Sequence, residues 1–169
     1  SEDGYIKANS NGTGAETVDD YNNSLALGTG FDGKISKTIL SFDTSAIPDG
    51  AVITRAYVQV TYNNMSGDPF NGGSNNIAID IKSGHFGNLV SLETGDWDAA
   101  ADADGIAEIT EFTSGTKNSS DFNSSGLNGI NKTGTTQVRL RFITNPPSSS
   151  TYLFIKQGSY AKLIVEYTE

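Results

Sequence analysis

The segment AVITRAYVQVTY, residues 51–62, alternates apolar with polar side chains along most of its length. One face of the extended segment carries Val52, Ala56, Val58, Val60 and Tyr62, and the other carries Arg55, Tyr57, Gln59 and Thr61. A period of two predicts a strand with one buried and one solvated face.

The same alternation recurs along the chain, in residues 77–82, 137–142 and 161–167. The run 38–42 is apolar on both faces and predicts a more deeply buried strand. Weaker strand patterns cover residues 4–8, 24–27, 106–112 and 152–156. Gly- and Pro-rich segments separate these runs, and no stretch has the pattern of a long amphipathic helix. The sequence therefore predicts an all-β fold, an antiparallel sandwich of two sheets with jelly roll as the preferred topology.

No shift in composition divides the chain, so residues 1–169 are predicted to form a single domain. The longest irregular segment is the polar stretch 114–135. Within it, residues 124–131 predict one short helix whose Leu127 and Ile130 contact the core.

Composition excludes several functional classes. The chain has no Cys, which rules out disulfides and Cys-ligated metal centres. A net charge of -9 argues against nucleic acid as a partner. No apolar run approaches the ~20 residues of a membrane helix, so membrane insertion is not expected.

Enzymatic activity is not expected either. The single histidine, His85, lies in a Gly-rich turn, and the Gly-x-Ser-x-Gly motif is absent. The 20 acidic residues include no pair that the sequence marks as facing each other across a cleft.

The segment SFDTSAIPDGAVI, residues 41–53, resembles the signature F-D-x-S-x-[IL]-P-x-x-A-x-I of DNRLRE-type extracellular β-sandwich modules. Similar segments of the same modules correspond to residues 79–87, 95–99, 130–137 and 162–167. The hexapeptide that names the family is absent. The resemblance implies an exported, non-catalytic β-sandwich, and some modules of this kind are carbohydrate-binding modules.

Two functions therefore stay open. The preferred one is a structural or adhesive component of a cell surface or extracellular filament, with other copies of the chain or other surface proteins as partners. The alternative is a carbohydrate-binding module of a secreted protein that acts on polysaccharides.

For sugar binding, the candidate platform is Trp97 with its flanking Asp96 and Asp98, because a pyranose ring packs its C–H face on an aromatic ring. Tyr57 is placed on the polar face of its strand and joins this candidate site, and Tyr21 and Phe70 are possible helpers. The competing interpretation is that Trp97 plugs one end of the sandwich.

A structural Ca²⁺ is the one candidate cofactor that the sequence indicates. The candidate ligands are the loop carboxylates Asp19, Asp20, Asp102 and Asp104. The competing interpretation is that these acids are simply solvated and aid solubility.

Assembly through strand edges would use the apolar terminal segments 4–8 and 160–168. The candidate residues are Tyr5, Ile6, Leu163 and Val165. Alternatively, both segments pair within their own sheet.

Overall fold

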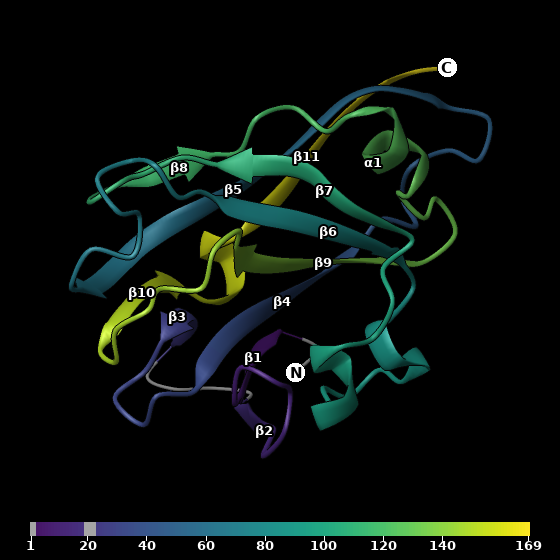
Figure 1. Cartoon of the computed structure of the whole chain (residues 1–169). Coiled ribbons are helices and arrows are strands. Elements are labelled where there is room, and N and C mark those ends of the chain that lie inside the picture. Colours follow the sequence, from purple (N-terminus) through teal and green to yellow (C-terminus); the bar gives the residue numbers. More distant parts are fainter. Residues whose placement is uncertain (1–2, 19–22) are drawn as a thin grey trace.

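The computed structural model describes residues 3–18 and 23–169, and its regular structure is mainly β-strand (Figure 1). Its strands are β1 (Gly4–Ala8), β2 (Glu16–Val18), β3 (Ser24–Thr29), β4 (Ile35–Asp43), β5 (Val52–Ser66), β6 (Ile77–Ser83), β7 (Ala103–Ile109), β8 (Thr116–Asn118), β9 (Thr135–Phe142), β10 (Thr151–Lys156) and β11 (Lys162–Thr168). Its short helices are η1 (Phe86–Asn88), η2 (Thr94–Trp97), α1 (Ser124–Asn128) and η3 (Gly158–Tyr160). Every strand pair is antiparallel, so the all-β antiparallel prediction is confirmed.

The two expected layers are joined into one curled sheet with the order β11-β5-β10-β3-β4-β9-β6-β7. β1 and β2 extend the sheet from β4, and β8 pairs with β5. The jelly-roll connectivity stays a prediction.

Two long strands make the sheet curl. Ser36 of β4 pairs with both Lys7 and Gly28, so β1 and β3 lie on opposite sides of β4. Thr38 pairs with both Tyr5 and Leu140, which places β9 on the same side of β4 as β3. β5 likewise pairs with two strands along one of its sides. It pairs with β11 along residues 52–59 and with β10 along residues 62–66. The strands β3 and β10 therefore lie between the two layers at one end of the molecule.

Residues 119–123 join the two layers on the other side. Ser119 N donates to Val58 O at 2.8 Å, and Phe122 N donates to Ala56 O at 2.8 Å. From the same segment, Ser120 N donates to Glu108 O at 2.8 Å. This segment thus connects β5 to β7 and covers the outer edge of β7.

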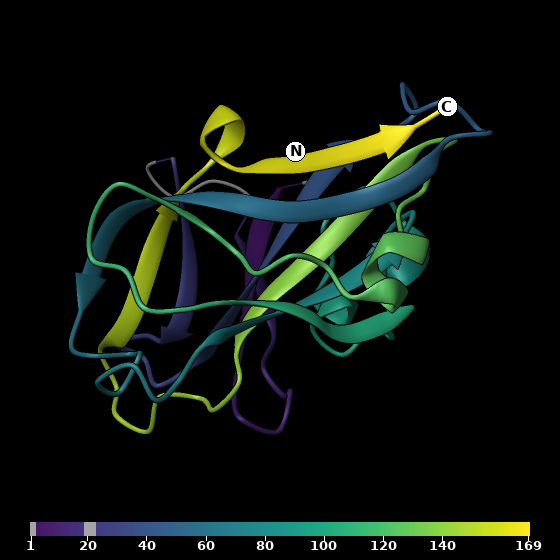
Figure 2. The same cartoon turned by 90° about the horizontal axis from the view of Figure 1, so that it is seen from above.

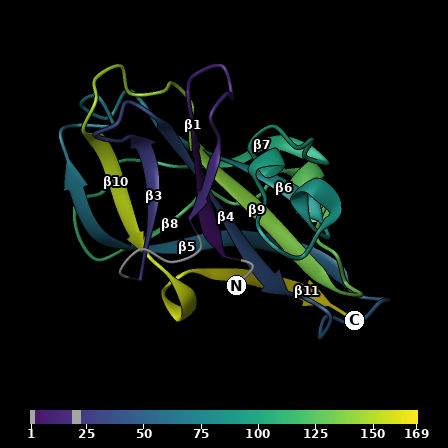
Figure 3. The same ribbon diagram turned by 90° about the horizontal axis from the view of Figure 1, so that it is seen from below.

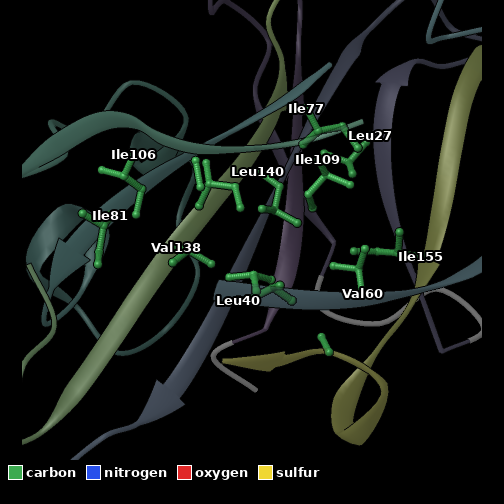
Figure 4. Close-up of a cluster of buried hydrophobic side chains, with 14 of the residues drawn as sticks. Leu27, Leu40, Val60, Ile77, Ile81, Ile106, Ile109, Val138, Leu140 and Ile155 are labelled. Atoms are coloured by element: carbon green, nitrogen blue, oxygen red, sulfur yellow. The ribbon is translucent and has the colours of Figure 1, made fainter. Parts of the chain in front are cut away.

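The main core fills the space inside the curled sheet (Figure 4). Ala56, Val58 and Val60 are fully buried, which confirms the alternation read in β5. Val52 is 64% exposed, so its predicted burial is wrong. A register shift between Glu166 and Tyr167 offsets the β5–β11 pairing at this end of β5, so Ile53 instead of Val52 packs against the main core.

A second buried cluster lies on the opposite face of β1 and β4. Ile6 and Ile39 point into it, and Phe86 and Trp97 from the η1–η2 segment cover it. This loop segment therefore acts as a small third layer.

The predicted helix is confirmed as α1, with Leu127 half-buried and Ile130 buried. The short strands β2 and β8 were not predicted, because each has only three residues. Within the described residues, no helix has both the length and the apolar character needed to cross a bilayer.

Candidate functional site

A groove of about 490 Å³ opens where β3 and β10 turn away from β1 and β4. Figure 3 shows these four strands side by side. The groove is lined by Tyr5, Lys7, Ala26, Gly30, Phe31, Asp32, Ser36, Asn64, Tyr152 and Phe154. It combines aromatic rings with side chains that donate and accept hydrogen bonds.

Strand register aligns the lining residues. Tyr152 of β10 pairs with Gly28 of β3, Gly28 pairs with Ser36 of β4, and Ser36 pairs with Lys7 of β1. Because paired residues share a face, these positions form one row across four strands. The groove is thus built on the rigid sheet as well as on a loop.

Three aromatic rings form a chain along the groove. The Phe31 and Tyr152 ring centroids are 5.4 Å apart, and those of Tyr152 and Phe154 are 5.1 Å apart, both edge-to-face. Tyr152 and Phe154 point outward because the intervening Leu153 is fully buried in the core. Phe31 is 78% exposed and Tyr152 and Phe154 are partly exposed, so all three residues reach the solvent.

The turn between β3 and β4 presents Phe31. Gly30 N donates to Lys34 O at 2.9 Å, and Lys34 N donates to the Asp32 carboxylate at 3.1 Å. These bonds close the turn and hold the exposed ring at one end of the groove. The ring of Phe31 is therefore exposed at this end of the groove and in contact with Tyr152.

Charged side chains flank the rings. Lys7 Nζ lies 2.9 Å from Asp32 Oδ2 and 3.2 Å from Glu16 Oε2, and Lys34 Nζ contacts Glu16 on its other side. The hydrogen bond from Lys7 lowers the pKa of Asp32 below its ordinary value, and the bonds from Lys34 and Lys7 lower the pKa of Glu16. The carboxylates are therefore ionised and available as acceptors at neutral pH.

The Asp32 pair gives a pH dependence that can be tested. Since Lys7 lowers the pKa of folded Asp32, the stabilisation is present above the ordinary value of 3.8 and is lost as pH falls through the lower folded value. We expect the denaturant midpoint of Asp32→Asn to fall less steeply than that of the wild type between about pH 5 and pH 2. Identical pH profiles for the two proteins would contradict this assignment.

Gly28 lets β10 approach β3. Its φ is +99°, and a Cβ there would lie 2.7 Å from Thr151 O and 3.1 Å from the Tyr152 Cα. We expect Gly28→Ala to lower the free energy of unfolding by about 1–3 kcal/mol and to displace Tyr152. Gly50→Ala is the matched control, because no atom lies within 4 Å of its added Cβ. Equal unfolding midpoints for the two variants would show that the close approach does not matter.

The expectation of an open stacking face at Trp97 is wrong. Trp97 is only 4% exposed, because its ring packs in the second cluster, and Lys37 Nζ lies 4.0 Å from the ring centroid. Burial lowers the pKa of Lys37, and the nearby Arg139 acts in the same direction. The burial agrees with the competing interpretation, in which Trp97 fills space in the fold.

The other residues proposed around Trp97 do not form a sugar site with it. Asp96 is buried, its carboxylate accepts from Glu93 N at 2.8 Å, and burial raises its pKa. Asp98 is exposed and 3.7 Å from Lys37 Nζ. Tyr57 lies on β5 with the Arg55 guanidinium 4.8 Å from its ring centroid. Phe70 is fully buried in the main core, which excludes it as a helper, and Tyr21 lies outside the described residues.

Of the four candidate calcium ligands, the structure describes Asp102 and Asp104, and each lies beside a cationic side chain. Asp102 contacts Lys82 Nζ at 2.7 Å and accepts from Ser83 N at 2.8 Å. Asp104 points toward Arg139, at 3.8 Å. Asp19 and Asp20 lie outside the described residues. Calcium binding stays a prediction.

The two terminal segments differ in their pairing. β1 is paired on both sides, with β2 and β4, and its Tyr5 and Ile6 are buried. Assembly through Tyr5 and Ile6 is therefore wrong, because their strand has no open edge. Leu163 and Val165 lie on β11, where they are half-buried against the main core.

A buried ionic cluster of Asp80, Arg139 and Arg141 was not predicted from the sequence. The Asp80 carboxylate is fully buried and accepts from Arg139, from Arg141 at 2.9 Å, and from Gly105 N at 3.0 Å. Arg139 Nη1 also donates to Ala99 O at 2.8 Å. The cluster thus ties β6 and β9 to the η1–η2 segment. The signal in the sequence is the opposite charge of Asp80 and Arg139, which occupy the polar positions of their alternating strands.

Comparison with known proteins identifies no family for the chain. No family model matches the chain, and no curated protein matches it. Among solved structures, it is similar to a xylanase 10C variant from Cellvibrio japonicus in complex with xylopentaose, with a TM-score of 0.42 and 14% identity. The match covers 98% of this chain but only 27% of the xylanase chain.

Proposed function

We propose that the chain is a non-catalytic carbohydrate-binding module and that the groove around Phe31, Tyr152 and Phe154 is its binding site. The observation that carries this proposal is the row of three aromatic rings beside an ordered set of polar side chains. Aromatic faces pack against the C–H faces of sugars, and nearby amide, hydroxyl and charged groups bind their hydroxyls.

The polar groups are suitably placed for sugar hydroxyls. Asn64 pairs with Phe154 across β5 and β10, and Ser36 lies in the same row as Tyr152. Asp32 and Lys7 lie at the Phe31 end of the groove. Donors and acceptors therefore lie beside the aromatic rings, as expected of a site that binds sugars.

The lining also supports binding without catalysis. Asp32 is the one carboxylate among the residues that line the groove, and the neighbouring Glu16 is bound to the same ammonium group of Lys7 as Asp32. Hydrolysis of a glycosidic bond ordinarily requires two carboxyl groups on opposite sides of that bond. The lining therefore supplies groups that can hold a sugar chain but only one carboxyl group, which favours binding over hydrolysis.

The proposal is tested by retention of the protein on a panel of polysaccharides, for instance xylan, cellulose, mannan, chitin and pectin. We expect at least one member to retain the wild type and to retain Phe31→Ala much less. Tyr160→Ala is the matched control, because Tyr160 is 53% exposed but lies outside the groove. Absence of retention on every member, or equal retention of the Phe31 variant, would contradict the proposal.

An extracellular location and membership of the DNRLRE-type modules stay predictions. The structural or adhesive role also stays a prediction, and the feature that bears on it is the edge of β11.

A further inference from the structure

β11 forms an edge of the sheet. Among the described strands its single partner is β5, and it lies along the outside of the molecule in Figure 2 and Figure 3. An edge strand exposes backbone N–H and C=O groups that another strand can pair with. β11 is seven residues long, which is enough for a ladder.

The sequence of β11 is complementary to itself. Residues 162–166 read Lys-Leu-Ile-Val-Glu, with a cation at one end, an anion at the other and three apolar residues between them. When two such strands pair antiparallel with Ile164 opposite Ile164, Lys162 of each copy faces Glu166 of the other. Opposite charges in directly facing positions stabilise an antiparallel pair, and like charges destabilise it.

The two faces of β11 fit this register. Leu163 and Val165 point toward the main core but are only half-buried, so part of each side chain remains in contact with solvent. In the antiparallel register Leu163 of one copy faces Val165 of the other, which covers this remaining apolar surface. On the outer face, Lys162 is exposed and forms no ion pair with any described residue.

We propose that two copies of this chain associate through their β11 edges in a symmetric antiparallel pair centred on Ile164. The interface is isologous, so it closes as a dimer, and a filament would need a second, different contact. The inference is independent of the proposed carbohydrate site, because the groove contains no residue of β11.

The association is expected to be weak. A contact of one short strand with another lies below the roughly 1,000 Å² that a stable interface buries. Self-association is therefore to be measured by sedimentation equilibrium from micromolar to millimolar protein over a series of salt concentrations. Salt screens the facing charge pairs and also the repulsion between two chains of net charge -9.

Charge reversal gives a direct test of the register. Lys162→Glu places Glu opposite Glu166 in the pair, and Glu166→Lys places Lys opposite Lys162, so each variant alone is expected to lose at least tenfold in association constant. Mixing the two variants restores opposite charges at both positions, so the mixture is expected to form a heterodimer with near wild-type affinity.

Glu166 also binds Arg55 at 2.9 Å, so Glu166→Lys removes an ion pair within the protein. Circular dichroism and thermal melts therefore check that each variant is folded. The matched control is Lys117→Glu, on β8 away from this edge, which should leave association unchanged. A wild type that stays monomeric at millimolar concentration would overturn the proposal. So would single variants that associate as well as the wild type, or a mixture of folded variants that stays monomeric.

Discussion

Replacing Asp80 by alanine is expected to lower the free energy of unfolding by about 3–5 kcal/mol. The carboxylate is fully buried and accepts hydrogen bonds from two arginines and one backbone amide. Its removal leaves the guanidinium of Arg139, whose side chain is only 7% exposed, with the more distant and largely exposed Asp104, at 3.8 Å, as its remaining counter-charge. Burial of an unpaired charge is far more costly than the loss of an ordinary hydrogen bond.

Equilibrium unfolding in urea measures this effect. Asp121→Ala is the control, because Asp121 binds Arg55 at 2.9 Å but is 56% exposed, and such pairs contribute about 0–1 kcal/mol. Asp80→Asn keeps the shape of the side chain and should fall between the two. A loss of less than about 1 kcal/mol for Asp80→Ala would mean that Arg139 is satisfied without the carboxylate.

Replacing Tyr152 by alanine is expected to weaken sugar binding at least tenfold, which corresponds to about 1.4 kcal/mol. Tyr152 lies between Phe31 and Phe154 and contacts both rings, so its loss breaks the aromatic row in the middle. Burial of an aromatic face against a ligand contributes roughly 25 cal/mol per Å², so about 60 Å² of lost contact is enough to give this effect.

Isothermal titration with the polysaccharide that retains the wild type measures the change in affinity. Tyr152→Phe keeps the ring and should bind within a few-fold of the wild type, and Tyr160→Ala should bind unchanged. A Tyr152→Ala protein that is folded and binds as tightly as the wild type would remove the groove from consideration.

The strand pattern was predictable because it depends on local alternation. In β6, β9 and β10, and in residues 56–62 of β5, every second side chain packs in the core, and this period is visible in the sequence alone. The short helix α1 was also predictable, since Leu127 and Ile130 are apolar within a polar stretch. The joining of the two layers into one sheet was not predictable from the sequence. It depends on β4 and β5 each pairing with two strands in succession.

The position of the site was harder to predict than the fold. A lone Trp between two acids suggested an exposed platform, but the η1–η2 segment folds back on the sheet and buries Trp97. Phe31 and Tyr152 are 121 residues apart in the sequence, and only the pairing of β10 with β3 brings their rings together. The usable signal was Phe31 itself, an aromatic residue in the short turn sequence Gly30-Phe31-Asp32-Gly33.

Backbone amide NMR during a titration with the retained oligosaccharide shows where the protein binds carbohydrate. If the aromatic groove is the binding site, we expect chemical-shift changes that saturate with ligand and are concentrated at Phe31, Asp32, Ser36 and residues 152–154. Changes concentrated instead around residues 94–98, or no saturable change anywhere, would contradict it.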